Sequence, residues 1–469
     1  MRTRMRAKAL APVLLLGLPL ATACGAASGA DGGSRTVTVT VGYQSKTINT
    51  VTAGTLLRSL GYFEQELAAR GKKDGVTYKV DWQDYATGAP ITAQMTAGKI
   101  DIGSMGDFPL LINAARGKEL KQPTRLVSVT GYNLRGGLNT VVTATGSKLG
   151  SLADLKGKKV STSVGSAADG TLVRALQRAG IDPEKGIEKL NQQPSVGASA
   201  LQAGSVDALS QFVAWPGQLA FEGRATALYD GAELNLPTFH GVTVREKFAA
   251  ERPTVLDDFL RAQRKATAYL RTQPVVAAEA VAKETGLPAE VVYLYNGANG
   301  IATFDPALRP ELLAALKEDV PVLKAAKLVD SVDVDAFVDP APLARAAVGS
   351  GAGSGAGSEF PAAAPARPEL WLKEGNRTQS FDTPAALLKA LAAAGPGGVR
   401  AAYVPDAVTG TPWFADKAVW VAEGSELRAF VTPSGAKAYA DQHAGSGARI
   451  VSFAEASAAA SASAGALAS

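Results

Sequence analysis

Hydrophobic and polar positions alternate in short runs, and longer helical patterns separate these runs. The run TVTVTVGY, which ends at Tyr43, alternates strictly and predicts a first β-strand. Residues 51–70 are rich in Leu and Ala and predict a helix, YKVDWQDY predicts the next strand, and APITAQMTAGK predicts a helix that ends at Gly98. Strands that alternate with helices in this way predict an α/β fold with a largely parallel sheet.

One short pattern occurs twice. The segments TAGKIDIG (96–103) and QAGSVDAL (202–209) share the motif Ala-Gly-x-[Ile/Val]-Asp, and each follows a predicted helix and opens an apolar strand. The repeat predicts two similarly built α/β lobes with a cleft between them. It is too short to establish a duplication.

The N-terminus has the composition of an export signal. MRTRMRAK carries four positive charges, ALAPVLLLGLPL is too short to span a bilayer stably, and small residues precede Cys24, the single cysteine of the chain. The segment resembles a bacterial lipobox, with Ala21 where Leu is more common. We therefore expect a signal peptide over residues 1–23 and a lipid anchor on Cys24, although a plain secretory signal with an incidental cysteine is the alternative.

Removal of residues 1–23 would lower the formal net charge from +5 to +1, because this segment holds four Lys and Arg residues. The basic pI therefore comes mostly from the leader, and we expect no nucleic-acid binding. The hydrophobic fraction of 46% is ordinary for a globular protein.

Composition also divides the rest of the chain. Residues 24–35 read as a flexible tether, and residues 348–368 form a linker that is Gly/Ser-rich at first and Pro/Ala-rich later. Residues 369–456 predict a second, small α+β unit, with helices in FDTPAALLKALAAAG and SGAKAYADQH and strands in AVWVAE and RAFVT. The Ala/Ser-rich tail, residues 457–469, is predicted to be disordered.

Catalytic and metal-binding motifs were sought and not found. The two histidines, His240 and His443, lie in different predicted units, and the chain has no Gly-x-Ser-x-Gly or His-Glu-x-x-His motif. LKGKKV (155–160) lacks the upstream glycine and the Ser/Thr of a phosphate-binding loop. Since no carboxylate pair stands out either, we expect neither an enzyme nor a cofactor.

An anion-binding loop is the strongest chemical signal in the residues themselves. KKVSTSVGSAADGTLVRALQRAG (158–180) predicts a strand, a turn and a helix, with Gly165, Ser166 and Ala167 at the N-terminus of the helix. Free backbone N–H groups and the helix dipole favour an oxyanion there. The alternative is that Ser166 is only an N-cap.

Six segments carry a pattern in a fixed order: VGYQ (41–44), LLRSLGYFEQEL (56–67), GAPITAQMTAGKIDIGSMGDFPLL (88–111), SLADLKGKKVSTSVGSAADGTLVRALQRAG (151–180), LQAGSVDALSQFVAWPGQLAFE (201–222) and LPTFHGVTVREKFAAERPTVLDDFLRA (236–262). Taken in this order, they resemble one family, the substrate-binding lipoproteins of ABC importers for aliphatic sulfonates, taurine and nitrate. The resemblance covers about residues 36–345.

The resemblance implies a two-lobed, periplasmic-binding-protein-like (type II) domain over residues 36–347. Lobe 1 would take residues 36–130 and 235–347, and lobe 2 residues 131–234. It also implies a cleft between the lobes that closes on ligand by hinge motion. The implied ligand-binding residues are Tyr43, Gln44, Gly106, Asp107, Phe108, Gly165, Ser166, Ala167 and Trp215.

One departure from the family pattern concerns the ligand. Pro216 follows Trp215 where the family commonly has an acidic residue, so a ligand amine such as that of taurine would lose a partner. Asp107 could supply one instead. Without the family pattern, Phe108 and Trp215 would be read as core residues.

The C-terminal unit resembles the C-terminal half of NosL, the copper-binding accessory protein of nitrous-oxide reductase. The shared pattern includes Tyr403-Val404, Asp406, Lys417-Ala418, Val421, Ala429-Phe430 and the helix that ends at His443. The segment contains no Cys and no Met, the soft ligands that suit Cu(I), so we predict no metal site.

The expected function is capture of a small organic anion, above all an aliphatic sulfonate, outside the cytoplasm and its delivery to an ABC permease. The protein would be a monomer, anchored through Cys24 to the outer face of the cytoplasmic membrane. Nitrate, bicarbonate or a thiamine-precursor-like heterocycle on the same fold is the second reading. The third is a metal-handling or accessory protein that acts through the C-terminal unit.

Overall fold

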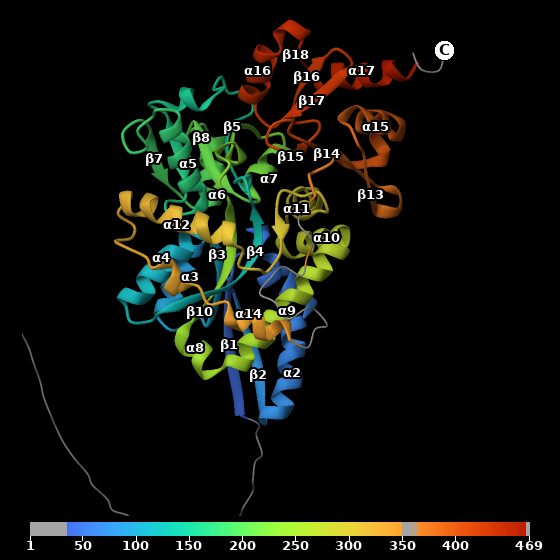
Figure 1. The fold of residues 1–469 in the computed structure, drawn as a ribbon. Coiled ribbons are helices and arrows are strands. Elements are labelled where there is room, and N and C mark those ends of the chain that lie inside the picture. The colour runs from blue at the N-terminus through green and yellow to red at the C-terminus, as the bar shows by residue number, and fades with distance from the viewer. Residues whose placement is uncertain (1–34, 349–359, 361–363, 466–469) are drawn as a thin grey trace, which may run out of the picture.

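The computed structural model describes residues 35–348, 360 and 364–465. The predicted leader, Cys24, the tether up to residue 34 and most of the predicted linker therefore lie outside the described residues. Within the described ranges, no helix is both long and apolar enough to cross a membrane. Figure 1 shows two sheets with their helices and a third, smaller unit at the C-terminus.

Lobe 1 is built on a six-stranded mixed sheet of order β11-β4-β10-β3-β1-β2. β1 runs parallel to β2 and β3, whereas β10 is antiparallel to β3 and β4. The strands are β1 (Arg35–Tyr43), β2 (Val76–Asp84), β3 (Ile102–Gly106), β4 (Thr124–Asn133), β10 (Thr238–Arg245) and β11 (Thr303–Phe304). The helices are η1 (Ile48–Ala53), α1 (Thr55–Leu60), α2 (Tyr62–Asp74), α3 (Gly88–Thr96), α4 (Asp107–Glu119), α8 (Glu246–Glu251), α9 (Pro253–Thr272), α10 (Pro274–Thr285), α11 (Ala289–Asn296), α12 (Pro310–Ala325), α13 (Val334–Phe337) and α14 (Ala341–Ala347).

The alternation of β1 explains the first core of this lobe. Val39 and Val41 point to one face, where they pack with residues of α1, α2 and α9. The predicted helix over residues 51–70 is wrong in one respect, because it is broken into η1, α1 and α2. Gly61 ends α1 in the left-handed conformation (φ +63°). Gly54 lies so close to Tyr43 that an added Cβ would be 2.9 Å from the ring.

Lobe 2 is built on a five-stranded mixed sheet of order β7-β6-β8-β5-β9. The chain passes between the lobes at residues 134–138 and 231–237. The strands are β5 (Asn139–Ala144), β6 (Lys159–Thr162), β7 (Glu188–Asn191), β8 (Ala208–Phe212) and β9 (Ala225–Asp230). The helices are η2 (Leu152–Leu155), α5 (Ala167–Arg178), α6 (Pro194–Gln202), α7 (Trp215–Phe221) and η3 (Gly231–Leu234).

The repeated Ala-Gly-x-[Ile/Val]-Asp motif has the same structural role in both lobes. Gly98 and Gly204 each follow a helix with positive φ (+73° and +67°). The motif's aspartates each accept a hydrogen bond from the backbone of a parallel strand: Asp101 from the N–H of Thr40 at 3.0 Å, and Asp207 from that of Lys159 at 2.9 Å. In both lobes, the motif therefore ends a helix and links the following strand to its parallel neighbour. The predicted two-lobed α/β architecture is confirmed.

The C-terminal unit has two small antiparallel sheets, of order β13-β12-β14-β15 and β17-β16-β18. Its predicted helices and strands are present. The elements are β12 (Glu369–Leu372), η4 (Glu374–Asn376), β13 (Arg377–Ser380), α15 (Pro384–Gly398), β14 (Val399–Pro405), β15 (Pro412–Phe414), β16 (Val419–Glu423), β17 (Glu426–Phe430), α16 (Pro433–Gln442), η5 (Ala444–Ser446), β18 (Arg449–Val451) and α17 (Phe453–Gly465).

The prediction of a disordered tail is wrong up to residue 465, because α17 extends that far. Ala456 and Ala460, four residues apart, lie on one face of α17 and are buried against the core of the unit, alongside Leu387 and Leu388 of α15. Tertiary packing therefore orders a sequence whose composition alone resembles a flexible tail.

Candidate functional site

The facing edges of the two sheets form the candidate site. In lobe 1, β1 and β3 both end at this edge, and β10 begins there, with His240 opposite Gly106. Gln44, the first residue after β1, is buried and its Nε2 donates to the carbonyl oxygen of Ser104 at 3.1 Å. Ligands of α/β sheets bind outside the carboxyl ends of the strands, which is where these residues lie.

In lobe 2, the N-terminus of α5 occupies the corresponding place after β6. Gly165 adopts φ +80°, which favours glycine, and its N–H donates to Oδ2 of Asp169 at 3.0 Å. Ser166 is the N-cap and accepts from the N–H of Asp169 at 3.3 Å. Ala167 and Ala168 are the first two residues of the helix, so their N–H groups have no intrahelical acceptor.

The two edges are in contact. The ring of Phe108 at the start of α4 lies over Gly170 of α5, where an added Cβ would overlap it, and Ala167 belongs to the same apolar cluster as Phe108. The N–H of Ala214 in lobe 2 donates to the carbonyl oxygen of Lys46 in lobe 1 at 3.3 Å. A cavity of about 20 Å³, roughly the room of one water molecule, lies between Asp107 and Ala167. The lobes are therefore closed on each other.

Further contacts tie the lobes together away from this edge. Arg174 of α5 forms an ion pair with Asp319 of α12 at 3.0 Å, and both side chains are largely buried. The N–H of Gly217 at the start of α7 donates to the hydroxyl of Tyr295 on α11 at 3.1 Å. Burial is the main cause that raises the pKa of the Asp319 carboxyl, and the nearby Asp107 carboxylate raises it further.

Tyr43 does not face the cleft, which corrects the expectation for this residue. It has the same strand parity as Val39 and Val41, so its ring lies on the helical face of the sheet, against Gly54 and edge-on to Trp82 at 5.9 Å between ring centroids. Arg58 lies over the ring at 5.9 Å. Tyr43 is therefore a packing residue of lobe 1.

Asp107 is at the cleft edge, but its carboxylate is already engaged. Oδ2 accepts from the hydroxyl of Thr238 at 2.6 Å and from the N–H of Phe239 at 3.2 Å, and Oδ1 accepts from the N–H of Phe108 at 2.8 Å. Burial raises the pKa of Asp107, and these hydrogen bonds oppose the increase. The carboxylate thus attaches the start of α4 to β10, and the expected contact with a ligand amine is not its role here.

Trp215 begins α7 and is partly buried against the core of lobe 2. The ammonium of Lys46, from lobe 1, lies 5.7 Å from the centroid of its ring. This cation–π contact places Trp215 at the boundary between the lobes. Pro216 behind it is buried at the first turn of the helix.

Sequence reasoning missed a set of buried amide groups at this boundary. Asn49 of η1, Asn139 at the start of β5 and Gln211 near the end of β8 each have a side-chain carbonyl oxygen without a hydrogen-bond partner in the described part of the chain. Because a buried polar atom normally has a partner, unpaired groups at facing strand ends are what a ligand site requires. Polar residues at the ends of apolar strands were the available signal.

Part of the chain is similar to known proteins. Residues 72–277 match the family model described as NMT1/THI5 like. The chain is 29% identical over 217 residues to an Escherichia coli protein named as an aliphatic sulfonates-binding protein, and 27% identical over 224 residues to the taurine-binding periplasmic protein of the same organism. These alignments cover 46% and 47% of the chain and 66% of each relative, just under two thirds. A Haemophilus influenzae protein named for thiamine biosynthesis is 32% identical, over 38% of the chain and 54% of that relative.

A solved structure agrees with the sequence matches. The crystal structure of the periplasmic aliphatic sulphonate binding protein SsuA from Escherichia coli matches 65% of the chain and 92% of its own length, with 26% identity and a TM-score of 0.51. These similarities support the family of ABC substrate-binding proteins. The two E. coli relatives and this structure are named as binding proteins, and two of the names describe the protein as periplasmic.

Proposed function

We propose that this chain is the extracytoplasmic substrate-binding component of an ABC importer and that it captures a small organic anion, above all an aliphatic sulfonate, between its two lobes. The observation that carries the proposal is the N-terminus of α5, with the free N–H groups of Ala167 and Ala168, at the contact between the lobes. Backbone N–H groups and the helix dipole favour an oxyanion at such a place. The names of the sequence relatives support the sulfonate class.

Each site residue then has a role. The N–H of Ala167 binds the sulfonate oxygens, and Ser166 and Gly165 hold the turn that presents this group. Phe108 and Trp215 form the apolar wall for the alkyl part of the ligand. Gln44, Gly106 and Asp107 set the shape of the lobe 1 edge. Closure of the lobes by hinge motion excludes water and presents a surface to a membrane permease.

The surroundings of the protein are proposed on the same basis. Export through the N-terminal signal and lipidation of Cys24 would hold a monomer at the outer face of the cytoplasmic membrane. The resemblance of the C-terminal unit to NosL stays a prediction. Nitrate and bicarbonate are alternative anions, and the similarity to a protein named for thiamine biosynthesis favours a heterocyclic thiamine precursor as the second candidate ligand.

Thermal unfolding of the chain tests the proposal. Taurine, ethanesulfonate, nitrate, bicarbonate and a pyrimidine precursor of thiamine would each be added separately. A ligand at one hundred times its dissociation constant adds about 2.7 kcal/mol of stability, a shift on the order of 5 °C for a chain of this size. A shift with the sulfonates supports the proposal, whereas a shift with the pyrimidine alone replaces it by the second candidate.

A further inference from the structure

His240 is buried at the lobe 1 edge of the cleft, and contacts with Asn49 and Gly106 define the orientation of its ring. The residue is 4% exposed, and it pairs with Gly106 across β10 and β3. A Cβ at Gly106 would lie 3.1 Å from Nε2 of His240, so the glycine gives the imidazole its room. The expected ligand residue Gly106 is therefore next to a ring nitrogen that sequence reasoning did not assign to the site.

Asn49 fixes which ring nitrogen carries the proton. Its Nδ2 lies 2.6 Å from Nδ1 of His240 and 3.3 Å from the carbonyl oxygen of Gly131. Since that carbonyl oxygen only accepts, the side-chain nitrogen of Asn49 must face it, and the same amino group then donates to Nδ1. A neutral imidazole whose Nδ1 accepts has its proton on Nε2. Burial keeps the ring neutral, because it lowers the pKa of His240 to about 3.

Nε2 of His240 is consequently an N–H donor, and no residue that the structure describes accepts from it. The carbonyl oxygen of Asn49 is buried and has no hydrogen-bond partner in the described part of the chain. A buried acceptor without a partner is costly, and a ring N–H without a protein acceptor keeps its hydrogen bond for another molecule, so both groups are expected to meet a ligand or ordered water.

We propose that His240 donates a hydrogen bond from Nε2 to the anionic head group of the bound ligand, opposite the N-terminus of α5. The inference rests on the proposed function and deepens it, because it adds a neutral, directional donor from lobe 1 to the backbone donors of lobe 2. Asn49 acts as the positioning residue that fixes the tautomer. Closure of the lobes would then bring the two sets of donors onto one anion.

Two substitutions that place an amide nitrogen differently test this assignment. In His240→Gln the amide nitrogen reaches the place of Nε2, and in His240→Asn it reaches only that of Nδ1. With ethanesulfonate and taurine as probes in calorimetry, His240→Asn should weaken binding about tenfold or more, and His240→Gln should stay within about threefold of the wild type. Equal losses in both variants, or none in His240→Asn, would overturn the assignment.

A measurement on the unmodified chain covers the case in which a variant does not fold. The chain has two histidines, so the imidazole nitrogen resonances can be assigned with little ambiguity. Addition of ethanesulfonate should shift the Nε2–H resonance of His240 and leave that of His443 in place. Binding without any shift at His240 would contradict the inference, and no binding by the wild type would contradict the proposed function instead.

A second observation, independent of His240, concerns the contacts of the C-terminal unit with both lobes (Figure 1). On the lobe 1 side, Arg400 binds Glu279 at 2.8 Å and Glu290 at 2.9 Å. The hydroxyl of Tyr403 donates to the carbonyl oxygen of Glu290 at 2.8 Å, and that of Tyr293 donates to Glu369 at 2.9 Å. The unit is thus firmly attached to α10 and α11.

The attachment to lobe 2 is smaller. The hydroxyl of Thr409 donates to Oδ2 of Asp230, at the end of β9, at 2.9 Å. The rings of Phe414 and Phe221 lie 5.3 Å apart. Asp230 ends β9, and only η3 and residues 235–237 separate it from β10 of lobe 1, so this attachment is next to the hinge.

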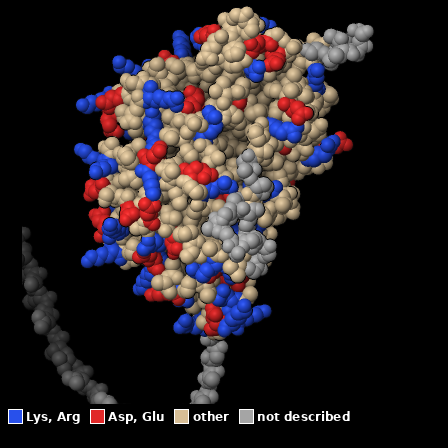
Figure 2. All heavy atoms as spheres, in the orientation of Figure 1, with Lys and Arg blue, Asp and Glu red and all other residues tan. Residues whose placement is uncertain are grey.

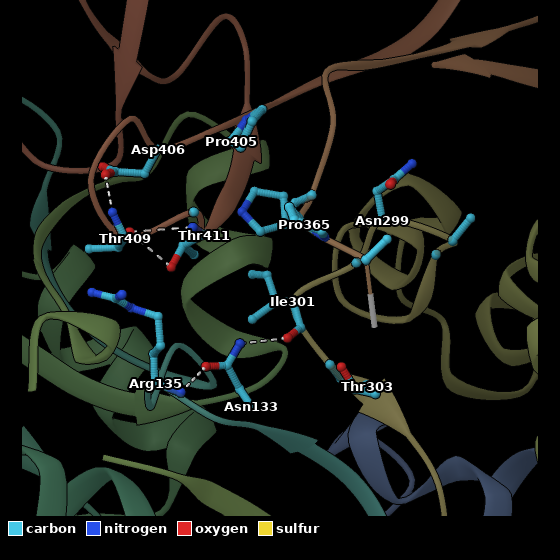
Figure 3. Close-up of a pocket in the computed structure, with 18 of the residues that line it drawn as sticks. Asn133, Arg135, Asn299, Ile301, Thr303, Pro365, Pro405, Asp406, Thr409 and Thr411 are labelled. Carbon is cyan, nitrogen blue, oxygen red and sulfur yellow. Dashed lines mark hydrogen bonds between the residues drawn. The ribbon is translucent and has the colours of Figure 1, made fainter. Parts of the chain in front are cut away.

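A cavity of about 940 Å³ separates the two attachments (Figure 3). Its walls are the loop after α11, the crossing segment after β4 and the loop that contains Asp406 and Thr411. Asn133 closes one wall, because its Nδ2 donates to the carbonyl oxygen of Ile301 at 2.8 Å and its Oδ1 accepts from the N–H of Arg135 at 2.9 Å. Figure 2 shows this side of the molecule hollowed below the C-terminal unit. The unit therefore spans the hinge and contacts both lobes.

We infer that the C-terminal unit is an intramolecular clamp that limits the opening of the lobes. Rotation of lobe 2 away from lobe 1 must break the hydrogen bond between Thr409 and Asp230 or separate Phe414 from Phe221, because the other side of the unit is held by several ion pairs and hydrogen bonds. The inference rests on the lobe motion of the proposed function.

Distance measurements between the lobes test the clamp. Spin labels at the exposed positions Lys118→Cys in lobe 1 and Lys156→Cys in lobe 2, in a Cys24→Ser chain, report the lobe separation without ligand. Thr409→Val combined with Phe221→Leu should give longer and broader distances than the parent, whereas Tyr403→Phe, which removes one lobe 1 contact, should not. Unchanged distances in the double variant would overturn the clamp, and saturating ethanesulfonate on the parent reports the lobe motion separately.

Discussion

The junction with the C-terminal unit and the cleft between the lobes both bury polar groups, and the two regions differ in how several of these groups are paired. At the junction, Oε1 and Oε2 of Glu369 accept from Tyr293 and Asn299, and the carboxylate of Asp406 accepts three backbone N–H groups. At the cleft, the carbonyl oxygens of Asn49, Asn139 and Gln211 have no partner in the described chain. On the proposed function, the unpaired groups of the cleft are satisfied when a ligand binds, whereas Glu369 and Asp406 at the junction are satisfied by the protein itself.

The largest expected effect is at the junction. Trp371 is fully buried, stacks near Tyr293 and lies under the guanidinium of Arg400 at 4.1 Å. Trp371→Ala should reduce the free energy of unfolding by about 3–5 kcal/mol, measured by urea denaturation. Trp215→Ala at the cleft is the matched control and should cost much less stability while weakening anion binding. Equal losses of stability in Trp371→Ala and Trp215→Ala would contradict the difference that we describe between the junction and the cleft.

A smaller effect is expected from a methyl group placed in the cleft. Gly170→Ala puts a Cβ into the ring of Phe108, so the lobes can no longer close fully. Overpacking of this kind costs about 1–3 kcal/mol, and we expect it as weaker binding of ethanesulfonate in calorimetry. Gly150→Ala, where an added Cβ meets no atom within 4 Å, is the control. If Gly170→Ala bound ethanesulfonate as tightly as the wild type, the cleft would tolerate the methyl group and the prediction would be contradicted.

The pH dependence of stability gives a finer test. His240 has an ordinary pKa of 6.5 and a folded-state pKa of about 3. Below pH 6.5, His240 is protonated in the unfolded chain but stays neutral in the folded chain. As the pH falls from 6.5 to about 3, this residue therefore lowers the free energy of unfolding by up to about 1.4 kcal/mol per pH unit. His240→Gln should show a correspondingly flatter profile in urea denaturation between pH 6.5 and 5. Parallel profiles would mean that the imidazole is not buried as described.

Local patterns predicted the layers and the position of the helix N-terminus at Ser166 well. The alternation up to Tyr43, the stop at Gly98 and the N-cap at Ser166 depend on neighbours within a few residues, and the structure confirms them. The sheets are mixed and not largely parallel, because β10 and β5 return antiparallel after the crossings. The order of elements along the sequence does not reveal the direction in which a strand enters a sheet after the chain has crossed between the lobes.

The misses share a long-range cause. The family resemblance implies Tyr43 as a cleft residue, but the parity of β1 turns its ring to the helical face of the sheet. His240 is 191 residues from Asn49 in sequence, so its tautomer is set by a contact that no local pattern contains. Residues 457–465 belong to helix α17, which packs its apolar face against α15.

The central claim, that an oxyanion binds at the N-terminus of α5, is tested most directly by calorimetric titration of Ala167→Pro with ethanesulfonate. Proline is well tolerated at the first position of a helix, and Ser166 before it is already extended (φ −87°, ψ 166°), so the fold should be kept. The substitution removes one N–H donor. The account predicts binding weaker by about tenfold, or about 1.4 kcal/mol, at an unchanged melting temperature. Affinity equal to that of the wild type would contradict it.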